Sequence, residues 1–407
     1  MSGTHSGYRS SMSTTGSEHS APAGLVVVGG GPAGHSAAAA YREAGGNDRV
    51  VIISADTAPP YERPPLSKDY LRGESDEDSL RLESAQFYRD HEIEMRLADP
   101  VVGLELDNAT VDTLSGERIG YRNCVLATGC DPAQLPVRGA DHPQILRLRS
   151  VTSARLLRSA AVHAQSALVI GSGFIGCEAA VSLAMRGLAV TVVSTDELPQ
   201  IGRLGRAAAE RIAGWLSWSG VHLQPNAEVA EIRDGRTVVA HDGSTFEADL
   251  ILSAAGVSPN SSPAEKAGLQ VDQGRIVVDA RMATSVPGVY AAGDVAIAHN
   301  DAAGRPLRVE HWGEALRMGE IAGVNAAGGK DSWSDVPGFW SQIGHHQLKY
   351  TAWGDGFDRD VLVEHDGDAF TVWYSRDGKA VGVLTHKSDA DYELGRELIS
   401  KGAPLPL

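Results

Sequence analysis

Cysteine is scarce in this chain. Three cysteines stand in 407 residues, at positions 124, 130 and 177, and an odd number cannot all pair within one chain. Small secreted folds that depend on disulfide bonds carry many more, so the composition argues against a disulfide scaffold and favours a reducing compartment. We therefore expect a cytoplasmic protein.

Basic charge and long apolar runs are scarce too. Lys and Arg number 36 against 52 Asp and Glu, which gives a net charge of −16 and argues against binding to nucleic acid or to anionic lipid. No apolar run has the length that a membrane span needs. Residues 1–23 are rich in Ser, Thr and Gly without an apolar centre, so we expect a disordered tail or an expression leader there rather than a signal peptide.

Glycine, by contrast, recurs in a pattern. The G-x-G-x-x-G spacing occurs in "GGGPAGHSAA" at Gly29, Gly31 and Gly34, and again in "GSGFIGCEAA" at Gly171, Gly173 and Gly176. Each motif follows a short apolar run and precedes an alanine-rich stretch, which is the strand–turn–helix setting of a dinucleotide site. The first glycine permits the tight turn, the second lets the backbone approach a pyrophosphate, and the third allows close packing. Two motifs predict two dinucleotides and a passage of electrons between them.

The rest of the chain predicts an α/β protein of two or three domains. A strand at 25–28, a helix to about 44 and a strand "RVVIIS" surround the first motif. The paired prolines of "YERPPLSKDYL" predict an extended segment. Short β-like runs occupy about 94–113, and a helix is expected at about 312–327. From about 331 on, short strands, a turn at 376–378 and a final helix predict a separate small domain.

Several stretches together carry a family resemblance. "VVVGGGPAG", "YERPPLSK", "LATG", "GVYAAGDVA", "RVEHWGEALRMG" and the second motif "GSGFIGCE" resemble the FAD-dependent pyridine-nucleotide oxidoreductases. The resemblance covers the chain from Leu25 to its end. It is strongest to the ferredoxin-reductase branch, which includes rubredoxin reductase and the reductases of bacterial oxygenase systems, with apoptosis-inducing factor as a relative.

The resemblance implies the fold class and the domain division. The fold is α/β with two Rossmann-like dinucleotide-binding domains, the FAD domain being split by the inserted NAD domain, and with a small α+β C-terminal domain. The expected boundaries are residues 24–131 and 256–330 for the FAD domain, 132–255 for the NAD(P)H domain and 331–407 for the C-terminal interface domain.

The resemblance also assigns residues to FAD. Asp56, which follows Gly34 by 22 residues, lies about where an acid binds the adenosine ribose, although the family's acid usually stands one place earlier, at Ala55. The helix that begins near Trp312 directs its N-terminus toward the flavin, where its dipole stabilises a reduced anionic ring. The residues expected at FAD are Gly29, Gly31, Pro32, Ala33, Gly34, Asp56, Arg63, Lys68, Val101, Ala127, Thr128, Gly129, Asp294, Glu310, His311, Trp312, Ala315 and Trp340.

A second set is assigned to the nicotinamide cofactor. It comprises Gly171, Gly173, Phe174, Ile175, Gly176, Glu178 and Asp196. Relatives pair the glutamate at the Glu178 position with the lysine at the Lys68 position, so these two are expected to join the cofactor domains where the hydride crosses. A lysine ammonium beside the flavin favours negative charge on the ring. No metal site is expected.

The choice of nicotinamide rests on the chain after "AVTVVS". Many relatives have an acid at the Ser194 position, whereas here Asp196 follows Gly176 by 20 residues, the offset of a ligand for the ribose 2′-hydroxyl. A carboxylate there repels a 2′-phosphate, while the nearby Arg203 and Arg206 are able to accept one. NADH is favoured over NADPH, and use of both stays open.

The route by which electrons leave depends on the cysteines. Disulfide reductases of this superfamily carry C-x-x-C or C-x-x-x-x-C beside the flavin, and neither occurs here. Cys130 and Cys177 are interpreted as structural. The predicted function is therefore NAD(P)H:ferredoxin oxidoreductase, with single electrons passing from FAD to a [2Fe–2S] ferredoxin that feeds an oxygenase. The alternatives are an NADH-dependent quinone or diaphorase-type reductase and a redox-switched binding protein like apoptosis-inducing factor. Monomer and homodimer both stay open.

Overall fold

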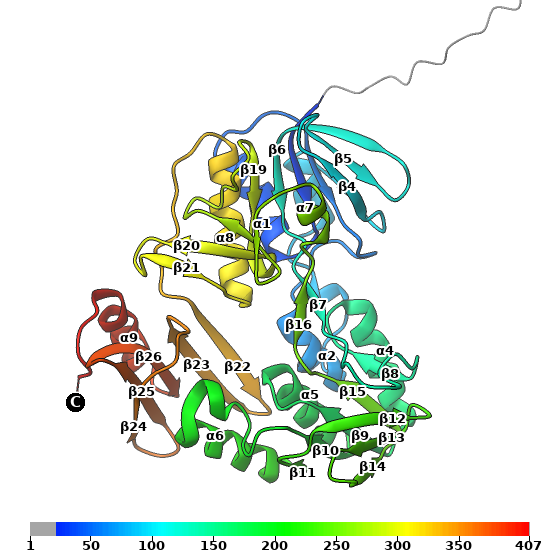
Figure 1. Cartoon of the computed structure of the whole chain (residues 1–407), viewed down its shortest axis with the longest axis vertical. Helices are drawn as coiled ribbons and strands as arrows, with labels where there is room; N and C mark the ends of the chain where they lie inside the picture. Colours follow the sequence, from blue (N-terminus) through cyan, green and yellow to red (C-terminus); the bar gives the residue numbers. More distant parts are fainter. Residues whose placement is uncertain (1–21, 407) are drawn as a thin grey trace, which may run out of the picture.

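The computed structural model describes residues 22–406 (Figure 1). The tail expected at residues 1–23 lies almost wholly outside the described residues. Within residues 22–406, no helix combines the length and the apolar character that crossing a bilayer requires.

The first glycine turn belongs to a seven-stranded sheet in the order β3-β2-β1-β6-β5-β4, with β19 beside β6. Its strands are β1 (Ala23–Val28), β2 (Val50–Ile53), β3 (Ile93–Arg96), β4 (Val101–Glu105), β5 (Thr110–Thr113), β6 (Arg118–Leu126) and β19 (Val289–Ala291). β1, β2, β3, β6 and β19 pair in parallel, so their carboxyl ends meet at one edge. Ligands of open α/β sheets bind at that edge.

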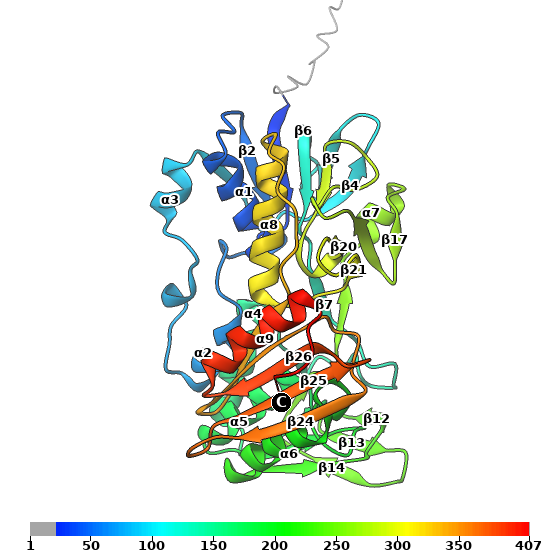
Figure 2. The ribbon, with the colours of Figure 1, turned by 90° about the vertical axis from the view of Figure 1, so that its left-hand side faces the viewer.

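Two helices pack closely against each other on this sheet. They are α1 (Pro32–Glu43), which follows the glycine turn, and α8 (Trp312–Ala326), and Figure 2 shows them side by side. Glycines permit the contact, because a Cβ at Gly319 would lie 2.2 Å from the Ala33 carbonyl oxygen and one at Gly323 would lie 2.2 Å from that of Ala37. The two helices fix where the N-terminus of α8 lies relative to the glycine turn.

The expectation of an extended segment at the paired prolines was wrong. Pro64–Ser67 forms a 3-10 helix, η1, with the prolines at its first two positions. The first turn of a helix needs no N–H partner and suits the fixed proline φ, so prolines that are excluded from a helix interior are well placed there. The segment continues through α2 (Asp69–Arg72), η2 (Asp78–Leu80) and α3 (Ala85–Asp90).

The second glycine turn belongs to a five-stranded parallel sheet in the order β11-β10-β9-β15-β8. Its strands are β8 (Ile145–Arg147), β9 (Ser166–Ile170), β10 (Ala189–Val193), β11 (Val221–Gln224) and β15 (Leu250–Ser253). They alternate with α4 (Val151–His163), α5 (Phe174–Met185) and α6 (Ile201–Trp218). An antiparallel sheet of β12 (Val229–Arg233), β13 (Thr237–Ala240) and β14 (Thr245–Glu247) completes this unit.

The second unit is inserted into the first. The chain enters it through β7 (Cys130–Pro132) and leaves it through β16 (Val257–Pro259), and these two strands pair antiparallel. After β16 the chain returns to the first unit, where β19 joins the seven-stranded sheet. The returning part also forms α7 (Ser262–Lys266), η3 (Gly293–Val295) and a sheet of β17 (Val271–Asp272), β18 (Arg275–Val278), β20 (Ala296–Asn300) and β21 (Arg305–Leu307).

The chain ends in an antiparallel sheet in the order β22-β23-β26-β25-β24, followed by α9 (Asp389–Lys401). The strands are β22 (Gly338–Ile343), β23 (His346–Ala352), β24 (Arg359–Glu364), β25 (Phe370–Arg376) and β26 (Lys379–His386). The expected turn is present, because Asp377 and Gly378 have φ of 51° and 75°, as a two-residue hairpin turn requires. This sheet shares an apolar core with α6, through residues such as Leu204, Ile212 and Phe370.

The contact between α1 and α8 gives a first prediction. Gly323→Ala should lower the free energy of unfolding by about 1–3 kcal/mol, because the new methyl group overpacks a helix contact that has no space for it. Gly214→Ala is the matched control, since Gly214 is exposed within α6 with no atom within 4 Å of an added Cβ. That change should stabilise the protein by up to about 1 kcal/mol. Urea unfolding followed by circular dichroism measures both, and equal effects of the two changes would contradict the packing argument.

Candidate active site

A cavity of about 1250 Å³ reaches from the first glycine turn to the second. It lies at the carboxyl edge of the first sheet and is closed on one side by β22 of the C-terminal sheet, which contributes Phe339, Trp340 and Ser341. Pockets for one small molecule measure about 300–1000 Å³. The larger volume and the two turns within one cavity indicate two ligands that meet.

Each glycine motif contains a turn, a packing contact and an open face. Gly29 has φ of 121°, and a Cβ at Gly34 would lie 1.9 Å from the Gly29 carbonyl oxygen. Gly171 and Gly176 repeat this relation, with φ of 106° and a distance of 2.1 Å. The middle glycines are open, since the nearest atoms to a Cβ at Gly31 and Gly173 are side-chain nitrogens at 3.7 and 3.8 Å.

The open glycines stand at the N-termini of two helices of 12 residues, α1 and α5. Backbone N–H groups and the positive end of the helix dipole point from such a terminus toward an anion. Both turns therefore fit a dinucleotide pyrophosphate.

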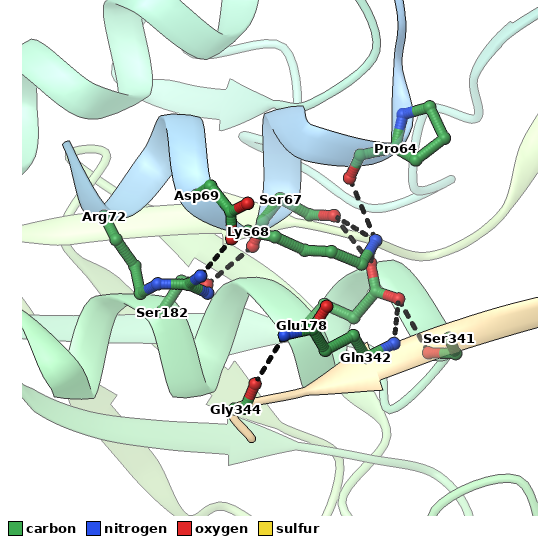
Figure 3. A network of polar contacts seen from close by, with 10 residues as sticks. All are labelled: Pro64, Ser67, Lys68, Asp69, Arg72, Glu178, Ser182, Ser341, Gln342 and Gly344. Carbon is green, nitrogen blue, oxygen red and sulfur yellow. Dashed lines mark hydrogen bonds and ion pairs between the residues drawn. The ribbon is translucent and has the colours of Figure 1, made fainter. Parts of the chain in front are cut away.

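The Glu178 carboxylate lines the cavity and contacts residues from both of the other units (Figure 3). Its Oε2 accepts hydrogen bonds from Lys68 Nζ and Ser67 Oγ, both at 2.6 Å. Its Oε1 accepts from Ser341 Oγ at 2.6 Å and from the Gln342 backbone N–H at 3.3 Å. Glu178 and Lys68 are each 5% exposed. A buried charge is tolerated when it is both paired and hydrogen-bonded, and this carboxylate satisfies both conditions.

Aromatic rings surround this network on the cavity side. The Lys68 ammonium lies 5.1 Å from the centroid of the Trp340 ring, and the Phe174 and Phe339 rings meet edge to face at 4.9 Å. Trp340 is 43% exposed although it is large and apolar. Together these rings offer flat apolar surface beside a fixed cation, as planar ring systems require.

An arginine that the sequence analysis did not single out also lines the cavity. Arg149 Nη2 donates to Asp294 Oδ2 at 2.5 Å, and its Nε donates to the Cys130 carbonyl at 2.8 Å. Arg63 Nη1 in turn donates to the Arg149 carbonyl at 3.3 Å. The residues around Arg149 match no motif, and its partner Asp294 lies 145 positions away in the sequence. The contact between them could therefore be found only in the structure.

His311 faces the cavity as a neutral imidazole. Burial, with the charge of Arg203 adding to it, lowers the pKa of His311 to about 3. Neither ring nitrogen has a hydrogen-bond partner among the described residues, and the ring lies 4.5 Å from that of Phe339. A buried ring nitrogen without a partner is costly. The ring nitrogens of His311 are therefore suited to hydrogen-bond the polar edge of a ring bound in the cavity.

Comparison with known proteins agrees with this geometry. Residues 23–319 match the family model described as pyridine nucleotide-disulphide oxidoreductase, and residues 338–407 match the one described as reductase C-terminal. The chain belongs to the pyridine nucleotide-disulphide oxidoreductase family.

Individual relatives extend over nearly the whole chain. Rhodocoxin reductase of Rhodococcus erythropolis is 32% identical over 94% of this chain and 90% of its own length. The ferredoxin–NAD(+) reductase subunit of the benzene 1,2-dioxygenase system of Pseudomonas putida is 30% identical over 92% of each chain. The solved covalent complex of putidaredoxin reductase with putidaredoxin contains a chain that matches with a TM-score of 0.88, at 27% identity and over 94% of each chain.

Members of this family bind FAD and use NAD(P)H. All residues predicted for FAD line the cavity except Gly34. Gly34 instead packs against the Gly29 carbonyl oxygen. Of those predicted for the nicotinamide cofactor, Gly173, Phe174, Ile175, Gly176 and Glu178 line it, whereas Gly171 and Asp196 do not. Glu310 lines the cavity and also pairs with Arg275.

The two predicted ribose acids follow the same local pattern with different outcomes. The Asp56 backbone N–H donates to Ser54 Oγ and that of Asp196 to Ser194 Oγ, both at 3.1 Å. Asp56 lines the cavity and accepts a hydrogen bond from Tyr61 at 2.7 Å. Asp196 is exposed outside it. The contact of Asp196 with a ribose stays a prediction.

The cysteines set this chain apart from the family members that reduce disulfides. All three are buried and unpaired, and burial raises the pKa of each thiol to about 12. Only Cys130 lines the cavity. A buried protonated thiol is a poor nucleophile, so these residues do not form a dithiol relay.

The pairing of Lys68 with Glu178, expected from the family resemblance, is present, and it yields a second prediction. Lys68→Met and Glu178→Gln should each lower the free energy of unfolding, Lys68→Met by about 3 kcal/mol or more, because it leaves a buried carboxylate without its cation. The double change should cost clearly less than the two single costs together.

Arg155 and Glu77 provide a matched control pair. They meet at 2.6 Å but are 55% and 40% exposed. Arg155→Met should therefore cost no more than about 1 kcal/mol. Urea unfolding of the flavin-loaded variants measures each free energy of unfolding. Additive losses of this free energy for Lys68→Met and Glu178→Gln would show that the two charges are not coupled.

Proposed function

We propose that this protein is an NADH-dependent ferredoxin reductase, which passes single electrons through FAD to a [2Fe–2S] ferredoxin that serves an oxygenase. The observation that carries the proposal is a single cavity that is lined by both dinucleotide turns and by the Lys68–Glu178 pair. A hydride crosses only when donor and acceptor are held in contact, and this arrangement brings the two sites together.

The proposal assigns each group of residues a task. FAD, when bound, accepts a hydride as a pair of electrons and releases the electrons singly. The first glycine turn, Arg63, Thr128, Gly129 and Asp294 bind it, and the N-terminus of α8 at Trp312 adds positive potential on the cavity side. The second glycine turn and Phe174 orient the nicotinamide cofactor. Lys68, held by Glu178, keeps a fixed positive charge at the junction, which favours negative charge as it develops there.

The acceptor is proposed from the relatives and from the cysteines. Rhodocoxin reductase, the benzene dioxygenase reductase subunit and putidaredoxin reductase are named for protein electron carriers or for ferredoxin. Here, no cysteine pair stands beside the cavity to take two electrons. Electrons therefore leave the flavin directly for a one-electron carrier. The reduced state of all three cysteines supports a cytoplasmic location.

Reduction of cytochrome c tests the acceptor. The protein should purify with bound FAD, NADH should bleach the flavin anaerobically, and fast cytochrome c reduction should depend on an added [2Fe–2S] ferredoxin. Ferredoxin-independent quinone reduction at the same rate would favour a diaphorase-type enzyme. A long-lived charge-transfer complex with slow turnover would favour a redox-switched binding protein, and a colourless protein that FAD does not restore would refute the proposal.

A separate test concerns the nicotinamide. Asp196→Ala should raise the KM for NADH more than that for NADPH, since a carboxylate near the ribose binds a 2′-hydroxyl and repels a 2′-phosphate. Glu247→Ala is the control, because it removes an exposed carboxylate of the same unit that does not line the cavity. A better rate with NADPH in the parent protein would overturn the preference and direct attention to Arg203, which lines the cavity.

A further inference from the structure

Three potential metal ligands meet on the C-terminal sheet, away from the cavity. His346 begins β23, His386 ends β26, and Asp368 lies in the turn between β24 and β25, two positions before β25 begins. One ligand atom of each residue lies within 4.8 Å of the others. β26 pairs with both β23 and β25, so the two histidines come from adjacent strands and Asp368 comes from the turn that leads into the next strand, all at one end of the sheet.

The Nε2 atom of His386 is directed toward the other two residues of this cluster. The residue is 1% exposed, and its Nδ1 lies 2.7 Å from the Gln347 carbonyl oxygen. Since a carbonyl only accepts, Nδ1 carries a hydrogen, and in the neutral ring the lone pair is therefore on Nε2. Nε2 has no hydrogen-bond partner among the described residues and lies 3.5 Å from Asp368 Oδ2. A histidine that donates one nitrogen to a carbonyl and leaves the other free is oriented as metal-binding histidines are.

The other two ligands are placed to join it. The His346 ring is stacked on that of Trp215 from α6, with centroids 4.5 Å apart and an angle of 1° between the planes. Asp368 is exposed, and both of its carboxylate oxygens contact Lys387 Nζ, at 2.7 and 2.8 Å. An exposed ion pair contributes little stability, so the carboxylate is readily released to a cation of higher charge.

We propose that His346, Asp368 and His386 form a binding site for one divalent transition-metal ion of the zinc class. Two imidazoles and one carboxylate are a ligand set that Zn²⁺ uses, with water in the fourth position. Hard cations such as Mg²⁺ prefer oxygen ligands and are not expected to bind. Bound metal links β23 and β26 to the turn before β25, beside α6. The site is independent of the proposed electron transfer.

Cobalt binding to the full chain, without a histidine tag and cleared of metal by a chelator, tests the site. Co²⁺ should bind with a stoichiometry of one per chain and give the visible absorption of a tetrahedral complex, and Zn²⁺ should abolish that absorption by displacement. His346→Gln and Asp368→Asn should each weaken binding on the order of tenfold or more. Asp368 is on the surface, so its variant tests the site even if a change at a histidine impairs folding.

Two controls separate this site from ordinary surface histidines. His345→Gln removes an exposed neighbour that is outside the cluster and should leave Co²⁺ affinity unchanged. Binding should also quench tryptophan emission, and Trp215→Phe should reduce the quenching while the cobalt absorption remains. The proposal is overturned if the parent chain shows no saturable binding, or if His346→Gln and Asp368→Asn bind Co²⁺ as the parent does.

Discussion

The arrangement of the three units depends on one buried carboxylate. Glu178 takes a cation and a hydroxyl from the first unit, and a hydroxyl and a backbone N–H from the C-terminal sheet, while its own helix starts at the second glycine turn. A buried anion loses its hydration and must recover it from fixed donors. All three units therefore have to be in place for this site to be satisfied, and the same condition aligns the two cofactor turns.

Close backbone approach is the second constraint. Gly34 and Gly176 press against the carbonyl oxygens of the turns they follow, and Gly319 and Gly323 let α8 lie on α1. None of these contacts leaves space for a side chain. The contact of α8 with α1 joins the two halves of the split first unit and fixes their relative position. The helix N-termini that face the cavity are thus set by packing and not by the ligands, which makes the site preorganised.

The cavity wall of this chain lacks the cysteine pair that disulfide-reducing members of the family use. The family name includes disulfides, but the cysteines of this chain are buried, unpaired and protonated. In place of a dithiol, the wall offers Trp340 beside the Lys68 ammonium, and Phe339 beside the neutral His311. An apolar, partly open wall of this kind suits the transfer of electrons to another protein better than covalent chemistry within the chain.

The sequence alone determined the features that adjacent residues encode. The glycine turns, α8, the hairpin turn at Asp377-Gly378 and the final helix were predicted because their signals are local: φ constraints, apolar period and turn chemistry. The expectation of an extended segment at the paired prolines was wrong because a proline run suits both an extended chain and the first turn of a helix. The pair of Lys68 and Glu178 was expected only through resemblance.

Contacts between residues that are distant in the sequence could be found only in the tertiary structure. Ser341 reaches Glu178 across 163 positions and Arg149 reaches Asp294 across 145, and neither residue stands in a motif. The cluster of His346, Asp368 and His386 likewise has no short-range spacing, since strand order and the turn before β25 bring its members together. A sequence shows which side chains are able to bind a charge, but the burial and the partners that fix their chemistry arise when the sheets close around them.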